Sequence, residues 1–347
     1  MSREVRETGE ETLPDWRIYK GTGQAAGEPI TSLPEPPPWR RFNGEGVAER
    51  PVDDGGEADR RLGSSNRHLP SRREVAMVNA AIYLRRPLLV TGRPGTGKSS
   101  LAYLIARELG LGPVLRWPIT SRVALNDGLY LYDAIGRVQA AGAYPQEELD
   151  IGDFVHLGPL GTALLPYDVP RVLLIDELDK SDLDLPNDLL NVFEEGEYQI
   201  IELVRLAKRQ PLVTVLTNDR GGFATIRGGR VQCRAFPLVI ITSNGEREFP
   251  PAFVRRCLKL DVEPPSFERL GAMVAAQFDA TEGVDIARLI TEFLTRSEEL
   301  GGLASDQLLN AVHLAAELAT SGAFQADDEW KDLLAAIWHP LFSSEAG

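Results

Sequence analysis

Hydrophobic positions between residues 71 and 260 alternate between short continuous runs and helical spacing. Four runs have strand length and are apolar enough to be buried on both faces: 87–91, 114–117, 172–175 and 238–242. Helical spacing over 72–84 precedes the first run, and helical spacing over 98–109 follows it. This alternation predicts an α/β fold in which helices flank a parallel sheet.

Two stretches within 71–260 exceed what a minimal sheet of this kind needs. The first lies near 144–165, and the second lies near 211–235. The second has β-rich flanks around turn-forming residues at 218–222 and 227–229, so it predicts a hairpin.

Residues 261–347 show helical spacing only. The apolar positions recur in four segments: 270–278, 286–294, 308–318 and 330–338. Charge also separates this part of the chain, with 4 basic and 16 acidic residues against 23 and 22 in residues 71–260. We therefore expect a small, acidic, all-helical domain after Pro264-Pro265.

Residues 1–70 contain 8 prolines and 9 glycines, which is typical of an extended or disordered arm. Two aromatic clusters interrupt it, at 16–19 and at 39–42. They either anchor the arm on the protein's own core or form short docking sites for a partner. The expected organisation is an arm (1–70), an α/β core (71–260) and a helical domain (261–347).

Overall composition narrows the class of protein. With 347 residues, 43% of them hydrophobic and 25% charged, the chain is too apolar for general disorder and too polar for a membrane bundle. No apolar run is long enough to span a membrane, and the polar first residues lack a signal-peptide core, so we expect a cytoplasmic location. Cys233 and Cys257 make neither a disulfide framework nor a zinc site. A net charge of −14 makes a nucleic-acid coat protein a poor fit.

The strongest chemical signal follows the first predicted strand. The segment reads Gly92-Arg93-Pro94-Gly95-Thr96-Gly97-Lys98-Ser99-Ser100 and matches the phosphate-loop pattern GxxxxGK[ST] at every specified position. Its backbone N–H groups and the following helix N-terminus are expected to hold phosphate oxygens. Lys98 is expected to reach the β- and γ-phosphates of ATP, and Ser99 to bind Mg²⁺.

A second signal lies at the end of the third predicted strand, where Asp176 and Glu177 follow an apolar run. A metal bound to phosphate needs a nearby carboxylate, which we assign to Asp176. Hydrolysis is helped by a second carboxylate that polarises the attacking water, which we assign to Glu177.

Taken together, these motifs resemble those of the AAA+ ATPases, and within them the MoxR-like branch. The resemblance covers about residues 70–320. It rests on the phosphate loop, on Gly158-Pro159-Leu160, on the stretch 173–180, on the helix at 187–195 and on the strand 236–244.

The resemblance implies roles for further polar residues. Asn244 corresponds to the sensor residue that helps to position the attacking water. Arg256, with Arg255 as the second choice, corresponds to an arginine finger supplied to the neighbouring subunit. Gln307 stands where the helical domain, or lid, of these ATPases normally offers an arginine to the γ-phosphate, so slow hydrolysis is expected.

The resemblance also implies function. A finger acting on a neighbour requires a homo-oligomer, expected as a hexameric ring, and the branch often works with a partner carrying a von Willebrand factor A-type domain. In related machines the extra segments contact substrate, which makes Phe154, His156 and Phe223 candidate contacts. The remaining histidines, His68, His313 and His339, lack metal-ligand spacing and are read as incidental.

Three functions remain open at this stage. The first is an ATP-driven oligomer that remodels, activates or assembles a partner protein. The second is a slowly hydrolysing, ATP-gated signalling switch, which the missing lid arginine favours. The third is a nucleic-acid motor, which the near-neutral core and the acidic lid make the weakest of the three.

Overall fold

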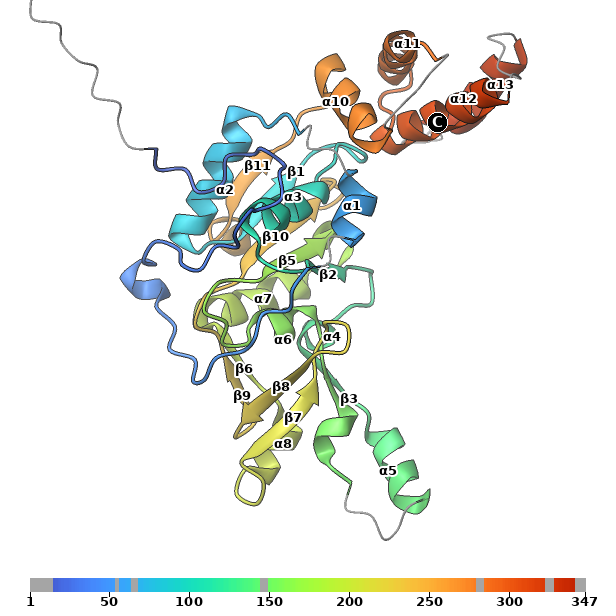
Figure 1. Cartoon of the computed structure of the whole chain (residues 1–347). Coiled ribbons are helices and arrows are strands. Elements are labelled where there is room, and N and C mark those ends of the chain that lie inside the picture. Colours follow the sequence, from blue (N-terminus) through green and yellow to red (C-terminus); the bar gives the residue numbers. More distant parts are fainter. Residues whose placement is uncertain are drawn as a thin grey trace, which may run out of the picture.

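A parallel sheet of five strands forms the centre of the molecule (Figure 1). The computed structural model describes residues 15–53, 56–63, 68–143, 149–278, 284–321 and 328–340. The strand order is β11-β1-β10-β5-β2, and every neighbouring pair is parallel. The strands are β1 (Leu88–Thr91), β2 (Leu115–Pro118), β5 (Val172–Asp176), β10 (Leu238–Ser243) and β11 (Leu258–Asp261). The first four confirm the predicted strands.

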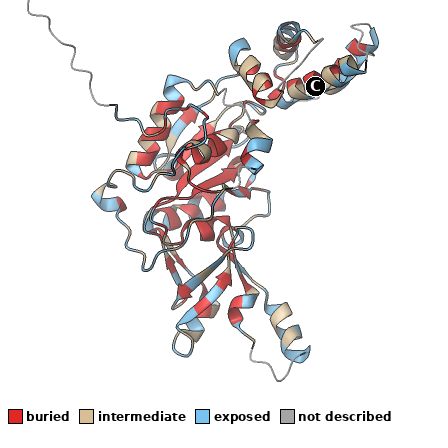
Figure 2. Cartoon of the chain, in the orientation of Figure 1, coloured by how far each residue is buried: buried red, intermediate tan, exposed pale blue. Residues whose placement is uncertain are grey.

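Both faces of this sheet are buried, which explains the continuous apolar runs (Figure 2). Every residue of β5 and of β10 is buried. Leu173 and Ile175 enter one hydrophobic cluster, whereas Val172 and Leu174 enter the cluster on the other face. The sheet is therefore held between two packed layers, and the carboxyl ends of its strands are fixed in position.

Helices cover the sheet as the alternation predicts. They are α2 (Arg72–Leu84), α3 (Ser100–Leu109), α6 (Pro159–Ala163), α7 (Asp184–Glu195) and α9 (Pro251–Val254). The N-cap of α2 is Ser71, whose hydroxyl accepts the N–H of Glu74. Helix α3 ends at Gly110 in the left-handed conformation, which stops the helix before β2.

A second sheet has six strands, in the order β3-β4-β7-β8-β9-β6, and it contains strands of both extra segments together with β3 and β6, which lie outside them. Its strands are β3 (Tyr130–Tyr132), β4 (Val155–Leu157), β6 (Glu197–Gln199), β7 (Leu212–Leu216), β8 (Phe223–Arg227) and β9 (Arg230–Gln232). The predicted hairpin within 211–235 is confirmed as β7, β8 and β9. The same part of the chain holds α4 (Leu125–Leu129), α5 (Ala134–Ala143), α8 (Ile201–Leu206), η2 (Ile151–Phe154) and η3 (Leu178–Lys180). In the first extra segment, residues 144–148 lie outside the described part of the chain.

A buried ion pair joins the second sheet to the core. Arg171 directly precedes β5 and is fully buried, and Asp219 lies in the loop between β7 and β8. The Arg171 guanidinium donates to both carboxylate oxygens of Asp219, at 2.7 and 2.8 Å, and to the carbonyl of Pro113 at 2.9 Å. The paired guanidinium therefore fixes this loop against the amino end of β5.

The N-terminal arm lies along the protein's own core (Figure 1). Tyr19 is fully buried, and its backbone exchanges hydrogen bonds with the side chain of Asn79 in α2. Both carboxylate oxygens of Glu108 accept backbone N–H groups from consecutive residues of the arm, Lys20, Gly21, Thr22 and Gly23. The arm also contains η1 (Pro38–Arg40) and α1 (Gly56–Leu62).

A second anchor of the arm lies at Arg40, which is 5% exposed. Its guanidinium donates to the carbonyl of Phe193 and lies 5.3 Å from the centroid of Phe236, on which Phe42 also stacks. Most of the described arm therefore docks on its own chain. This agrees with the interpretation that the aromatic clusters anchor the arm on the protein's own core. Trp39 differs, being 79% exposed.

Four helices follow the core sheet: α10 (Phe267–Gln277), α11 (Ile286–Glu299), α12 (Ser305–Thr320) and α13 (Asp328–Ile337). They confirm the four helical segments of the acidic domain. They share a hydrophobic cluster of their own, built from residues such as Leu270, Phe293, Leu308 and Trp338. Among the described helices, none has the length and apolar character to cross a membrane.

Candidate functional site

The loop between β1 and α3 carries the phosphate motif at the carboxyl end of the sheet. Gly95 and Gly97 adopt φ values of +73° and +83°, which residues with a side chain rarely adopt. The Lys98 ammonium donates to the carbonyls of Gly92 and Arg93, at 2.9 and 2.7 Å. Burial lowers the pKa of Lys98, although the nearby carboxylates oppose this effect. The Lys98 side chain therefore folds back onto the backbone of the phosphate loop.

Ser99 and Asp176 lie side by side, as predicted from their motifs. The Ser99 hydroxyl donates to Asp176 Oδ1 at 2.6 Å, and the Thr242 hydroxyl of β10 donates to the same oxygen at 2.9 Å. A hydroxyl and a carboxylate at this separation are the hard oxygen donors that Mg²⁺ takes beside phosphates, so the residues fit this ion.

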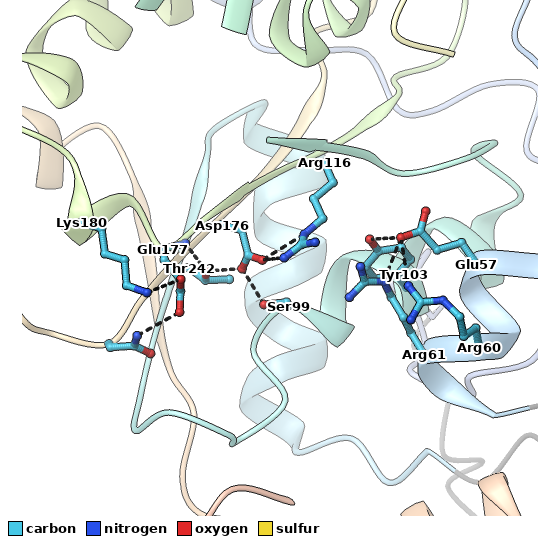
Figure 3. A network of polar contacts seen from close by, with 11 residues as sticks. Glu57, Arg60, Arg61, Ser99, Tyr103, Arg116, Asp176, Glu177, Lys180 and Thr242 are labelled. Atoms are coloured by element: carbon cyan, nitrogen blue, oxygen red, sulfur yellow. Dashed lines mark hydrogen bonds and ion pairs between the residues drawn. The ribbon is translucent and has the colours of Figure 1, made fainter. Parts of the chain in front are cut away.

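Hydrogen bonding keeps Asp176 ionised. Burial by itself raises the pKa of this carboxyl, but the donors Ser99, Arg116 and Thr242 outweigh it and hold the pKa below its usual value. Ser99, Thr242 and Arg116 all point toward Asp176 (Figure 3).

Glu177 lies at the turn that follows β5. Its backbone has φ +63°, a left-handed conformation that is uncommon for a residue with a side chain, and its N–H donates to the Thr242 hydroxyl at 2.8 Å. Its side chain receives Lys180 Nζ at 2.7 Å and Asn244 Nδ2 at 3.4 Å. The structure therefore brings the predicted Glu177 and Asn244 together.

Asp179 organises the loop that holds Asn244. Its Oδ2 accepts the backbone N–H groups of Asn244 and Glu246, at 2.9 and 3.0 Å. Its Oδ1 is buried and has no partner within the described residues. A carboxylate from η3 thus fixes the end of β10 relative to β5.

Neither predicted finger arginine contacts the phosphate loop or the acidic pair of its own chain. Arg256 Nε donates to Glu194 Oε1 at 2.7 Å. Arg255 is exposed, and its side chain makes no hydrogen bond or ion pair with the part of the chain that the structure describes. Both backbone carbonyls accept from Arg86.

The lid contacts the phosphate loop through its backbone. Ser305, the first residue of α12, donates both its N–H and its hydroxyl to the carbonyl of Gly95. Gln307 does not face this loop: its Oε1 accepts the N–H of Ala304 and its Nε2 donates to the carbonyl of His339. The residue that replaces the expected lid arginine therefore caps a helix.

A cavity of about 90 Å³ lies beside the phosphate loop, between the arm, α2, α3 and the lid. Its lining includes Leu69, Thr96, Gly97, Lys98, Leu101, Leu104, Val262, Met273 and Leu309. Such an apolar hollow next to phosphate-binding groups suits the base of a nucleotide.

A buried carboxylate, Glu74, lies at the edge of this cavity. It accepts from Tyr19 Oη at 3.2 Å, contacts His68 Nε2 at 2.8 Å and lies 3.7 Å from Arg269 of α10. His68, read as incidental from its spacing, is thus a contact between the arm and α2. The arm and the lid meet at this carboxylate.

Of the predicted substrate contacts, Phe223 is 66% exposed at the start of β8. His156 Nε2 lies 2.9 Å from the carbonyl of Thr217, and the residue is exposed. Phe154 is partly buried at the end of η2. Phe223 and His156 are therefore exposed, whereas Phe154 is not.

Sequence reasoning missed three polar residues of the site: Arg116, Thr242 and Asp179. Thr242 ends an apolar run, and Arg116 alternates with the buried Leu115 and Trp117, so neither has a motif of its own. A signal does exist for Asp179, since a carboxylate in the turn two residues after Glu177 is a candidate to accept backbone N–H groups there.

A family model matches the part of the chain that carries these residues. Residues 87–257 match the family model described as an AAA domain of the dynein-related subfamily. No curated protein matches the chain. Two solved structures of NtrX from Brucella abortus, in complex with ATP and with ADP, are similar at 15% and 16% identity, with TM-scores of 0.40 and 0.38. They cover 77% and 78% of this chain and 54% and 56% of NtrX, so the chain spans about half the length of those structures.

The family match spans β1, the phosphate loop, the acidic pair and the strand that leads to Asn244. Those are the elements that the structure assembles at the carboxyl edge of one parallel sheet. Residues 87–257 are thus similar to an AAA domain of the dynein-related subfamily.

Proposed function

We propose that this chain binds Mg·ATP at the phosphate loop and hydrolyses it with Glu177 as the residue that orients and polarises water. In this assignment Lys98 and the loop N–H groups hold the phosphates, while Ser99 and Asp176 hold the metal. Mg²⁺, when bound, neutralises charge on the phosphate oxygens. Asn244 fixes the Glu177 carboxylate.

One observation carries the proposal: Glu177 Oε1 lies 3.4 Å from Asn244 Nδ2, on the strand end next to the Ser99–Asp176 pair. The Glu177 side chain is 41% exposed, so water has access to it. Lys180 Nζ donates to the other carboxylate oxygen, Oε2, at 2.7 Å and so helps to hold the Glu177 side chain in position.

The direct test is Glu177→Gln, with Glu195→Gln as a control on the exposed face of α7. Glu177→Gln is expected to bind ATP as the wild type does and to lose about 10²-fold or more in steady-state phosphate release. Glu195→Gln is expected to turn over normally. Equal turnover in both variants would remove Glu177 from the mechanism.

We further propose that a second copy of the chain completes the site with an arginine. The motif favours Arg256, whereas the absence of a side-chain partner favours Arg255, since a finger must leave its own subunit. The expected assembly is a homo-oligomeric ring, with a hexamer as the expected size.

Complementation tests this shared site. The single variant Glu177→Gln and the double variant Arg255→Ala/Arg256→Ala are each expected to be inactive when assayed alone. Mixing equal amounts restores activity to about a quarter of the sites, because one in four interfaces then joins an intact Glu177 to an intact pair of arginines. Single Arg255→Ala and Arg256→Ala variants identify the finger. A mixture without activity would show that each site is complete within one chain.

The work done by hydrolysis is proposed from the MoxR-like resemblance: remodelling, activation or assembly of a partner protein, which the resemblance describes as a von Willebrand factor A-type protein. The second sheet and the exposed Phe223 support a protein-contacting role. An ATP-dependent complex with the Glu177→Gln ring, lost in Phe223→Ala, is the expected result. A partner held equally with and without ATP would contradict it.

An ATP-gated switch is the second candidate, and the contacts of Gln307 favour it. Both ends of its amide are engaged within the lid, so this residue offers nothing to the γ-phosphate. If the switch is correct, the purified protein retains ATP stoichiometrically and shows almost no steady-state phosphate release. Sustained turnover of about 1 per second would favour the remodelling ATPase.

A further inference from the structure

Arg116 on β2 contacts the carboxylate to which we assign the metal. Its Nε and Nη2 both donate to Asp176 Oδ2, at 3.1 and 2.7 Å, and its side chain is 40% exposed. Asp176 is 9% exposed at its side chain. The carboxylate thus carries an arginine on one oxygen and two hydroxyls on the other (Figure 3).

These contacts saturate Asp176. A carboxylate accepts about four hydrogen bonds, and Ser99, Thr242 and the two nitrogens of Arg116 provide four. The Oδ1 donors are uncharged hydroxyls, and one of them belongs to the other assigned metal ligand. The Oδ2 donor is a permanent cation that cannot lose its proton.

A hydrated Mg²⁺ ion and a guanidinium compete for the same oxygen. The water on Mg²⁺ needs a carboxylate lone pair as its acceptor, and both positive charges repel each other across a partly buried site. Within the described residues, the Arg116 side chain makes no other hydrogen bond or ion pair. It is therefore free to turn outward once Asp176 is taken by the metal.

We propose that Arg116 is a positioning residue that holds Asp176 in the absence of metal and is displaced when Mg²⁺ binds with the nucleotide. This inference rests on the proposed Mg·ATP site. Its consequence is that Arg116 lowers the affinity for the metal and leaves the affinity for metal-free nucleotide unchanged. A purely structural arginine predicts the opposite, namely weaker binding in both conditions when it is removed.

The test compares wild type, Arg116→Gln and the control Arg122→Gln, an exposed arginine without a side-chain partner in the described chain. Mn²⁺ binding in the presence of saturating ADP is measured by electron paramagnetic resonance, and ADP binding in EDTA by titration with a fluorescent ADP analogue. Arg116→Gln is expected to bind Mn²⁺ about tenfold more tightly, since a charge-assisted hydrogen bond no longer opposes the metal. Its ADP affinity in EDTA is expected to match the wild type.

A thermal shift gives an independent readout. Without metal, Arg116→Gln is expected to melt below the wild type, and Mn²⁺ with ADP is expected to raise its melting temperature by more than it raises that of the wild type. Unchanged or weaker Mn²⁺ binding in Arg116→Gln overturns the inference while leaving the site intact. Absence of ADP binding in the wild type overturns the proposed function, and the inference with it.

Discussion

Ser305 of the lid donates two hydrogen bonds, from its N–H at 3.2 Å and its hydroxyl at 2.9 Å, to the carbonyl oxygen of Gly95 in the phosphate loop. Ser305 is 4% exposed, so this contact is shielded from water. The lid therefore contacts the loop backbone directly, without a charged side chain as intermediary.

Gly95→Ala tests this contact. A methyl group at Gly95 lies 2.3 Å from Cα and Cβ of Ala304, and the φ of +73° disfavours alanine as well. Nucleotide affinity is expected to fall by about tenfold or more, and the first turn of α12 is expected to exchange its amide hydrogens faster.

The matched control is Gly142→Ala in α5, where an added methyl group meets nothing within 4 Å. This change is expected to be neutral or stabilising by about 0.5–1 kcal/mol. Equal nucleotide affinity in Gly95→Ala and the wild type would show that the loop and the lid move independently.

Arg40→Ala is expected to destabilise the protein by about 2 kcal/mol or more, because it removes a buried hydrogen bond to Phe193 and a contact with the Phe236 ring. Arg41→Ala removes an exposed ion pair of 3.6 Å with Glu35 and is expected to change stability by less than about 0.5 kcal/mol. Urea unfolding measures both. Similar values for the two variants would mean that the arm contributes little to the fold.

The Cys233 thiol is expected to report on arm docking. Burial raises its pKa to about 12, so at pH 8 only about one molecule in 10⁴ carries a thiolate there. Alkylation in a Cys257→Ser background should therefore be slow at pH 8 and rise about tenfold per pH unit. Because Phe42 packs against the cluster that contains Cys233, Arg40→Ala should accelerate alkylation at pH 8. Fast labelling of the Cys257→Ser protein would contradict the docked arm.

Asp219→Asn is expected to destabilise the protein by about 3–5 kcal/mol, since Arg171 remains buried without a counter-charge. Glu299→Gln is a control: its ion pair with Arg296 is exposed and should contribute less than about 0.5 kcal/mol. Denaturant unfolding measures both. A small effect of Asp219→Asn would show that the second sheet holds its place without this pair.

The sequence predicted the strands that are buried on both faces and the helices with a clear apolar stripe. It did not predict β11, in which Lys259 and Asp261 alternate with Leu258 and Leu260 at the edge of the sheet. It also missed β3, β4 and β6, because three-residue strands are too short to show a period. These short strands form only because they pair with strands that lie far away in the sequence, as β6 does with β9.

The placement of the site residues was predictable where one short segment holds the whole motif, as for Lys98, Ser99 and the Asp176–Glu177 pair. The partners of these residues come from elsewhere. Arg116 reaches Asp176 across a strand pair, and Glu74 meets Arg269 across two domains. Local patterns carry no information on such contacts, which the fold alone creates.

The docked arm also has a consequence for the order of folding. Arg40 contacts Phe193, 153 residues further along the chain, and the ring of Phe236. During synthesis Arg40 emerges well before both of these partners, of which Phe236 is made last. This anchor of the arm therefore forms late, because its docking closes a long loop.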